Sequence, residues 1–320
     1  MIPALVLTAG LATRLRPLSL VRAKAALPVA GEPLVRRILR QLAGAYVPSA
    51  VLNLHHLPET ITRVVGGGED LGIPVRYSWE NTVLGSAGGP SRAIPLMSDL
   101  THATGSTFFI VNGDTLTDVD LIALAHTHHE SGALVTMAVV PNTQPDKYGG
   151  VLVGRNNIVT GFVRRGASEP SFHFIGVQVA DRAAYAGVSD AVPSESIGAL
   201  YPKLLAERPN SVRVFPCTAE FHDIGTPADY LETSLLLAAR DMGDLSPGAR
   251  SHVDPSARIE RSIVWDDVVV ERDVVLKACV VADGARVPAG SSWEGVTLRP
   301  AAGSLAAGEE RIGELAVSRL

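Results

Sequence analysis

The sequence is poor in the residues that mark several protein classes. It contains two cysteines, Cys217 and Cys279, in 320 residues. This number is too small for a disulfide scaffold and favours two reduced, buried thiols. No apolar run approaches the length of a membrane-spanning helix, and no basic residues precede the apolar N-terminus as they would in a signal peptide. These absences predict a soluble, cytoplasmic chain with no membrane partner.

An excess of positive charge is also absent. The chain carries 28 Lys and Arg against 33 Asp and Glu, for a formal net charge of −5. A general nucleic-acid binder needs a basic face, so we expect no nucleic-acid partner, whereas a nucleotide site needs only a few local cations. The sequence also lacks a Walker lysine with its serine or threonine and a Gly-x-Ser-x-Gly motif.

The first two thirds of the chain alternate apolar runs with amphipathic stretches. Runs of strand length are Ala4–Leu7, Ala50–Leu54, Val75–Ser78, Phe108–Val111 and Leu134–Val140. Helical patterns lie between and beyond them, at Leu34–Ala43, Pro58–Val65, Gly88–Met97, Leu121–Ser131 and Ala228–Arg240. Such alternation predicts an α/β domain with a mostly parallel mixed sheet. Ligands bind beyond the carboxyl ends of such strands, so we expect Gly10, Asn112 and Asp114, which each follow a predicted strand, on one face.

The pattern changes from about Ser251, where an apolar residue recurs every six positions. One series is Val264, Val270, Leu276 and Ala282. This period is typical of hexapeptide-repeat β-helix coils, with an irregular β-sandwich as the alternative. We therefore predict an α/β domain over 1–245 and a short left-handed β-helix with the tail over 246–320. Because a short coil leaves apolar ends to cover, we expect it to pack against the α/β domain or a second subunit of a homo-oligomer, outside the ligand site.

The stretch from Ala4 to Pro28 carries the strongest chemical signal. Its apolar strand ends in the small residues Ala9 and Gly10, a turn that leaves backbone N–H groups available to bind phosphate. Arg14 and Lys24 add positive charge to the same stretch. A bare glycine turn followed by solvated arginines would look the same over so short a span, so the alternative of an ordinary strand–turn–helix stays open.

The spacing of this stretch resembles the signature of the nucleoside-diphosphate-sugar pyrophosphorylases, or sugar-1-phosphate nucleotidyltransferases. That signature reads L-A-x-G-x-G-T-R-L-x-P-L-T, with P-K near the end of the loop. The matching positions are Leu7, Gly10, Thr13, Arg14, Leu15, Pro17, Leu18 and Lys24. Ala12 replaces the usual second glycine, which would restrict the loop if φ there is positive, and Ala23 replaces the proline. The resemblance implies a Rossmann-like nucleotidyltransferase domain that joins an NTP to a sugar 1-phosphate.

Two aspartates lie in contexts similar to those of the family. Asp114 follows a predicted strand in Asn112-Gly113-Asp114, where it could also be the cap of a turn. Asp223 lies in His222-Asp223-Ile224-Gly225-Thr226-Pro227, which resembles W-x-D-I-G-T-P. The resemblance implies that both bind Mg²⁺, an ion that prefers one or two carboxylates plus substrate phosphates. It also implies a nucleotide site that contains Leu7, Ala9, Gly10, Thr13, Arg14, Lys24 and Asn112.

The segment Leu84–Gly89, LGSAGG, resembles the family's L-G-T-A-G beside the nucleobase. Glu80 precedes it. A carboxylate only accepts hydrogen bonds, and guanine offers two adjacent N–H donors, so Glu80 favours GTP. The resemblance places both Glu80 and Gly85 in the nucleotide site. A solvated surface glutamate is the alternative.

On the sugar side, Tyr148-Gly149-Gly150-Val151 resembles Y-G-x-V. Arg165 stands where a lysine of F-x-E-K holds the sugar phosphate, and arginine keeps that charge. Gly176 matches the glycine of N-A-G-I-Y, although Phe174 replaces the asparagine. The resemblance therefore implies a sugar-phosphate site at Gly149, Arg165 and Gly176.

The pattern is closest to the mannose-1-phosphate guanylyltransferase branch, which implies GTP and mannose 1-phosphate as substrates and GDP-mannose as product. One alternative is a UTP- or dTTP-dependent enzyme for glucose or N-acetylmuramate 1-phosphate. Another is a catalytically silent regulatory subunit that binds nucleotide-sugar. A decayed enzyme usually loses a catalytic group, and all four are present: Arg14, Lys24, Asp114 and Asp223.

Overall fold

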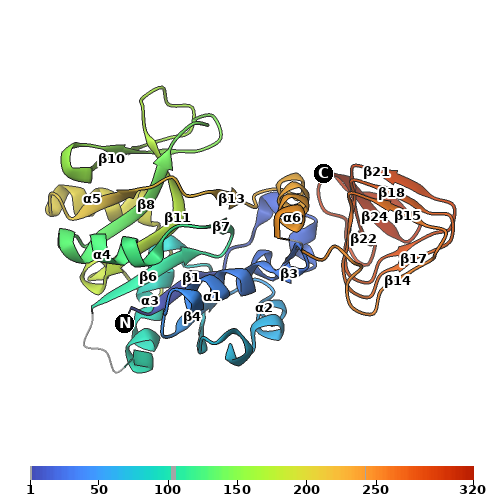
Figure 1. Ribbon diagram of the computed structural model, residues 1–320, viewed down its shortest axis with the longest axis horizontal. Coiled ribbons are helices and arrows are strands. Elements are labelled where there is room, and N and C mark those ends of the chain that lie inside the picture. Colours follow the sequence, from blue (N-terminus) through green and yellow to red (C-terminus); the bar gives the residue numbers. More distant parts are fainter. Residues whose placement is uncertain (1, 102–105, 242) are drawn as a thin grey trace. The chain divides into compact units, whose positions relative to one another are not determined.

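The computed structural model describes residues 2–101, 106–241 and 243–320. They form two compact units, each built from segments far apart in the sequence (Figure 1). Unit 1 is Met1–Gly10 with Val35–His222, and unit 2 is Leu11–Leu34 with Asp223–Leu320. The segment that carries Arg14 and Lys24 thus belongs to the same unit as the C-terminal strands, and the division at 245 stays a prediction. No helix in the described ranges has the length and apolar character needed to cross a membrane.

Unit 1 is built on a nine-stranded mixed sheet with the order β10-β9-β11-β6-β1-β4-β5. In addition, β8 pairs with β11, and β12 pairs with β8. The strands are β1 (Ala4–Leu7), β4 (Ala50–Leu54), β5 (Val75–Trp79), β6 (Thr107–Asn112), β8 (Val135–Pro141), β9 (Gly150–Val153), β10 (Val159–Val163), β11 (Phe172–Asp181) and β12 (Val212–Pro216). Strands β6, β1, β4 and β5 run parallel, whereas β11 runs antiparallel to β6, β8 and β9. The expected α/β mixed sheet is confirmed, with its parallel part concentrated around β1.

The helices are α1 (Leu34–Gly44), α2 (Pro58–Val65), α3 (Gly85–Thr101), α4 (Leu121–Ser131), α5 (Tyr201–Glu207) and α6 (Pro227–Asp241). Local chemistry sets several of their ends. Pro58 opens α2, where its missing N–H costs nothing. The Asp120 side chain accepts a hydrogen bond from Ala123 N at the start of α4. Helix α3 begins at Gly85, three residues before the expected start, so the residues of LGSAGG after Leu84 form its first turn.

Apolar side chains on the sheet form the core of unit 1. Leu5, Val51, Phe108 and Ile110 are at most 1% exposed and belong to one buried cluster with residues of α3 and α5. Helices pack against the sheet in Figure 1. Parallel strands buried in this way read as continuous apolar runs, which is why the sequence located β1 and β4 to the residue. The same burial fixes the carboxyl ends of these strands, from which the candidate site residues extend.

The C-terminal part of unit 2 is a stack of short parallel strands. They are β14 (His252–Val253), β15 (Arg258–Glu260), β16 (Ile263–Val264), β17 (Val269–Val270), β18 (Val275–Lys277), β19 (Val280–Val281), β20 (Arg286–Val287), β21 (Ser292–Glu294) and β22 (Val296–Pro300). They pair as β14-β17-β20, β15-β18-β21 and β16-β19-β22. Successive rungs are 17 residues apart, as in the bond from Cys279 N to Ser262 Oγ. We call residues 252–300 the C-terminal coil; its inward side chains, including Val270, Leu276 and Val281, form a second buried cluster.

The tail, whose path the sequence did not indicate, extends one sheet of the coil. Strand β24 (Leu315–Arg319) pairs antiparallel with β22 and with β23 (Glu310–Ile312). Arg299 Nε donates to Glu309 Oε1 at 2.6 Å beneath this hairpin, and both side chains are at most 9% exposed. The hairpin therefore covers the edge of β22 that would otherwise present unpaired backbone groups. Two smaller sheets pair β2 (Pro28–Val29) with β3 (Glu32–Pro33) and β7 (Thr115–Thr117) with β13 (Phe221–Asp223).

Candidate functional site

The loop Leu11–Leu34 is held in a compact, irregular shape by three short 3₁₀ helices, at Thr13–Leu15, Leu18–Leu20 and Lys24–Ala26. Ala12 precedes the first with φ 46° and ψ 49°, a left-handed conformation that costs a non-glycine residue roughly 1–2 kcal/mol. The loop therefore needs a positive φ where this sequence has alanine in place of the usual glycine. Ser19 Oγ donates to the Ala12 carbonyl at 2.9 Å, and this bond helps to hold the strained residue.

Arg14, Lys24 and Asp223 converge in unit 2 from segments about two hundred residues apart. Lys24 Nζ lies 3.9 Å from Asp223 Oδ1, and both side chains are largely buried, at 14% and 20% exposure. A Cβ added at Gly225 would lie 3.4 Å from Arg14 Nη2 and 3.5 Å from Asp223 Oδ2. Arg14 and Asp223 thus meet beside the Gly225 backbone, where the glycine leaves them room, and Lys24 joins them through its ion pair with Asp223.

Asp229 joins this cluster, although sequence reasoning did not select it. Its Oδ2 would lie 3.2 Å from the same added Cβ at Gly225. It accepts a hydrogen bond from Thr226 Oγ1 at 2.9 Å, and its own N–H donates to that oxygen at 3.1 Å. The signal in the sequence is an acidic residue in the first turn of α6, where a carboxylate is favoured by the helix dipole. Asp229 therefore fixes the turn that follows Asp223.

In unit 1, the ends of β1 and β6 bring Leu7 beside Asn112, its partner in the parallel register. Gly113 N donates to the Leu7 carbonyl at 2.9 Å, and a Cβ on Gly113 would come within 2.5 Å of that oxygen. Gly176 has φ +80° and would place a Cβ 3.0 Å from the Asn112 side chain. Leu7, Asn112 and Gly176 are therefore in contact, with Asp114 two residues beyond Asn112. Asp114 Oδ1 accepts a hydrogen bond from Thr115 Oγ1 at 3.2 Å. In the turn after β1, Ala9 is buried and Gly10 is exposed.

Glu80 lies in a buried polar network, at 5% exposure, so the alternative of a solvated surface glutamate is wrong. Asn53 Nδ2 donates to its Oε1 at 2.7 Å, and Leu84 N donates to its Oε2 at 2.8 Å. Asn53 Oδ1 in turn accepts from Thr8 N at 2.7 Å. The network joins the carboxyl ends of β1, β4 and β5. Sequence reasoning missed Asn53, whose signal is one amide in an otherwise apolar strand.

Gly85, at the start of α3, is held by a second segment that the sequence did not indicate. A Cβ at Gly85 would lie 2.6 Å from Glu195 Oε1 and from the Ser194 carbonyl. Ser86 Oγ donates to Glu195 Oε2 at 2.7 Å, and Ala87 N donates to Ser194 O at 2.9 Å. The first amides of α3 are therefore partly satisfied by the protein itself.

The expected sugar-phosphate residues Gly149 and Arg165 also lie together in unit 1. A Cβ at Gly149 would lie 3.1 Å from the Val163 carbonyl and 3.9 Å from Arg165 N, and Arg165 is exposed. The neighbouring Tyr148 ring contacts that of His173, with centroids 4.1 Å apart. Burial lowers the pKa of His173 to about 4, so this imidazole is neutral at pH 7.

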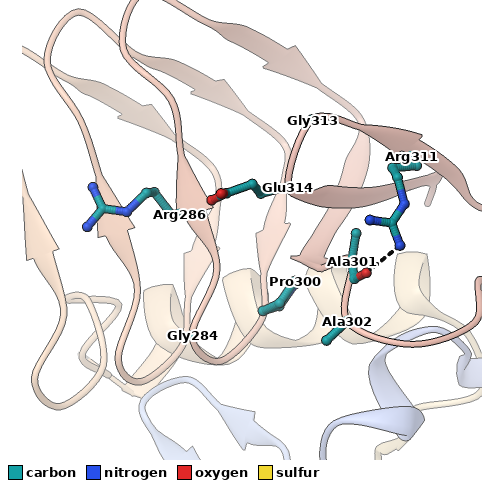
Figure 2. Close-up of a pocket in the computed structure, with 8 residues that line it drawn as sticks. All are labelled: Gly284, Arg286, Pro300, Ala301, Ala302, Arg311, Gly313 and Glu314. Carbon is teal, nitrogen blue, oxygen red and sulfur yellow. Dashed lines mark hydrogen bonds between the residues drawn. The ribbon is translucent and has the colours of Figure 1, made fainter.

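A cavity of about 320 Å³ opens in the C-terminal coil and contains none of these residues. Figure 2 shows Arg311 turned toward Ala301, whose carbonyl accepts from Nη2 at 2.6 Å. Arg286, which also lines the cavity, pairs with Glu271 at 2.6 Å. Both arginines are thus engaged within the unit that contains the coil.

Comparison with known proteins gives a consistent family. A family described as nucleotidyl transferase matches residues 3–240. Mannose-1-phosphate guanylyltransferase of Mycobacterium tuberculosis is 26% identical over 308 residues, covering 86% of this chain and 83% of the relative. UTP–glucose-1-phosphate uridylyltransferase of Synechocystis is 25% identical over 306 residues, covering 89% and 76%.

The fold has solved counterparts. The crystal structure of HddC from Yersinia pseudotuberculosis complexed with GMP-PN matches with a TM-score of 0.62 and 21% identity, covering 74% of this chain and all of the other. At 21% identity this similarity shows a shared fold and nothing more. Because the sequence family spans most of the chain, however, the protein belongs to the nucleotidyl transferase family and is a nucleotidyltransferase.

Proposed function

We propose that the protein joins GTP to mannose 1-phosphate, forming GDP-mannose and pyrophosphate. The observation that carries this proposal is the convergence of Arg14 and Lys24 on Asp223. Arg14 and Asp223 lie beside Gly225, and Lys24 pairs with Asp223. Two cations on a strained small-residue loop, with a carboxylate from β13 beside them, suit a polyphosphate and the charge that develops when it reacts. The relatives named as mannose-1-phosphate guanylyltransferases support the choice of substrates.

The proposed reaction is a displacement at the α-phosphorus of GTP. An oxygen of the sugar phosphate forms the new P–O bond, and the bond to the β-phosphate breaks, so that pyrophosphate leaves with its electron pair. The acceptor is already ionised at neutral pH and needs no general base. Arg14 binds the β- and γ-phosphates and Lys24 neutralises charge at the α-phosphate, which offsets the repulsion between two polyanions. The ion pair with Asp223 holds Lys24 before substrate arrives.

Asp114 and Asp223 are proposed to hold Mg²⁺. Their carboxylate oxygens are the hard ligands that Mg²⁺ prefers, and one or two of them suffice when phosphates supply the rest. Within the described residues no group of three or more His, Cys, Asp and Glu could hold a metal ion. When bound, the ion polarises a phosphoryl oxygen. On the acceptor side, Gly149, Arg165 and Gly176 are proposed to bind the sugar phosphate.

A second candidate is the UTP- or dTTP-dependent reaction with a glucose-type sugar phosphate. One observation favours it: both Glu80 oxygens already accept hydrogen bonds from Asn53 and Leu84, which weakens the argument that Glu80 reads guanine. The Synechocystis relative is named for UTP and glucose 1-phosphate. We also retain as proposals a left-handed course of the C-terminal coil and assembly into a homo-oligomer.

Two aspartate variants test the proposed chemistry. Asp114→Asn and Asp223→Asn should each lower kcat for pyrophosphate release from GTP and mannose 1-phosphate by about 100-fold or more, the scale of losing one electrostatic stabiliser. Asp120→Asn is the matched control, because asparagine also caps a helix and Asp120 caps α4. Near-normal kcat in both site variants would remove the proposed metal ligands.

A further inference from the structure

Arg22, two residues before Lys24, reaches two carboxylates of the C-terminal coil. Its Nε donates to Asp283 Oδ2 at 2.7 Å, and its Nη2 donates to Asp283 Oδ1 at 2.6 Å and to Asp266 Oδ2 at 2.7 Å. The Arg22 side chain is 13% exposed. A bidentate arginine–carboxylate contact fixes the orientation of the two groups as well as pairing their charges. This largely buried contact therefore attaches the loop that carries Lys24 to the coil in a defined orientation.

Trp265 reinforces the attachment from the same rung as Asp266. Its ring lies 5.2 Å from the Arg22 guanidinium carbon, within the range of a cation–π contact. The indole is 1% exposed, and its Nε1 donates to Tyr230 Oη at 2.9 Å. Tyr230 in turn donates to the Pro28 carbonyl at 2.6 Å. The loop is therefore tied to the coil on both sides of Lys24, directly at Arg22 and through Tyr230 at Pro28.

The same contacts reach the other member of the ion pair. Tyr230 lies on α6, which begins at Pro227, four residues after Asp223. Its ring meets that of Trp265 edge-on, with centroids 6.1 Å apart. Asp266 N also donates to Asp283 Oδ1 at 3.0 Å, so the two acceptors of Arg22 are bonded to each other. One small region of the coil thus contacts both elements that present Lys24 and Asp223.

We propose that the C-terminal coil positions the reactive cation of the nucleotidyl-transfer site, with Arg22 as the positioning residue that Asp283, Asp266 and Trp265 hold. This inference rests on the proposed function of Lys24. It gives the coil a catalytic contribution that acts through the loop carrying Lys24. Lys24 must stay near its place beside Asp223 to meet developing charge, and small displacements of a charged group are costly to rate.

The test compares Arg22→Met, Asp283→Asn and the double variant in the full-length protein. We expect each single variant to lower kcat for pyrophosphate release about tenfold, with KM for GTP changed less than about twofold, because the lost positioning matters most in the transition state. The double variant should be no slower than the slower single one, since Arg22→Met already removes the bonds to Asp283 that Asp283→Asn weakens. Arg22→Lys, which keeps the charge but not the bidentate guanidinium contact, should recover part of the loss in kcat.

Arg250→Met is the matched control. Arg250, just before the coil, makes a bidentate contact with Asp267 within the coil. Both side chains are exposed, at 69% and 49%, and this contact does not include the loop that carries Lys24. Its removal should leave kcat unchanged. Wild-type kcat in both Arg22→Met and Asp283→Asn would overturn the inference. If Arg22→Met does not fold, Asp283→Asn decides alone, because it leaves Arg22 bonded to Asp266.

Limited trypsin digestion adds a readout that does not depend on the reaction. Asp283→Asn should speed cleavage after Lys24 relative to wild type, with cleavage after Arg250 unchanged. Unchanged cleavage after Lys24 would contradict the positioning role. If wild type released no pyrophosphate while Asp283→Asn still sped cleavage after Lys24, the proposed function would fail and the structural coupling would stand. If wild type released pyrophosphate while cleavage after Lys24 was unchanged in Asp283→Asn, the coupling alone would be rejected.

Discussion

The Asn53 amide donates to the Glu80 carboxylate across the ends of two neighbouring parallel strands, with 2.7 Å between Nδ2 and Oε1. Asn53 receives a hydrogen bond from Thr8 on one side, and Glu80 receives one from Leu84 on the other. Each donor in this buried row has one acceptor. The row therefore links the turn after β1 to the start of α3, the two segments expected to meet the nucleotide.

Reversing the polarity of this row provides a sharp test. Glu80→Gln replaces one acceptor with a donor, which leaves Asn53 or Leu84 without a partner and should cost about 1–3 kcal/mol in free energy of unfolding. Asn53→Asp together with Glu80→Gln restores every bond, because the carboxylate introduced at position 53 would accept from Thr8 and from the new amide. Urea denaturation should show the double variant closer to wild type than either single one. Additive losses would contradict the hydrogen-bond assignment.

The same variants separate two roles for Glu80. If Glu80 holds the loop, KM for GTP should rise in Glu80→Gln and recover in the double variant. If its carboxylate binds guanine directly, KM for GTP should stay high in both Glu80→Gln and the double variant, because the double variant carries the negative charge at position 53 instead of 80. Steady-state kinetics at saturating sugar phosphate distinguishes these outcomes.

Arg165 and Arg164 form a natural pair of test and control, since both are exposed after β10. Arg165→Ala should raise KM for the sugar phosphate about tenfold or more, the scale of a charge-assisted hydrogen bond to phosphate. KM for GTP should change little. Arg164→Ala should leave both constants near wild type. Equal effects of the two substitutions would show that the expected correspondence over Phe162–Gly166 is wrong.

Stability should depend on pH through His128. This side chain is 4% exposed on α4, and its Nδ1 lies 2.9 Å from Thr136 Oγ1. Burial lowers its pKa to about 4, while Asp181 acts in the opposite direction. Between pH 6.5 and 4 the unfolded chain therefore binds a proton that the folded chain does not. The free energy of unfolding should fall as pH falls, by up to about 1.4 kcal/mol per pH unit for this group.

His128→Asn, which keeps a polar atom near the Nδ1 position, should make this fall less steep in urea denaturation at pH 4.5 to 7. Part of the slope should persist, because burial also lowers the pKa of His173 to about 4. His126→Asn is the control on the same helix, since that side chain is 71% exposed. An unchanged slope in His128→Asn would contradict this origin of the pH dependence.

The sequence predicted the elements whose causes are local. Strands β1 and β4 were bounded correctly because buried parallel strands are continuous apolar runs between turn residues. Helix α2 was bounded correctly by Pro58 and the glycine after Val65. The start of α3 was missed because Gly85 is a poor helix former, and contacts with Ser194 and Glu195 override that preference.

The sequence also predicted which charges converge, but not what holds them. Arg14, Lys24 and Asp223 were selected by resemblance, and they do come together. The contact of Arg22 with Asp283 spans 261 residues, and no local pattern distinguishes Arg22 from a solvated arginine. Glu80 was read as a ligand or a surface residue because the sequence does not show that Asn53 lies opposite it. Long-range pairing of polar groups depends on register, which a single sequence does not fix.

The central claim is tested most directly by pyrophosphate release, measured over a matrix of four NTPs and several sugar 1-phosphates with Mg²⁺. We predict the highest kcat/KM for GTP with mannose 1-phosphate. A maximum for UTP or dTTP with glucose 1-phosphate would move the protein to the second candidate. Absence of pyrophosphate release from every pair, with GTP still bound, would contradict the account and favour a silent regulatory subunit.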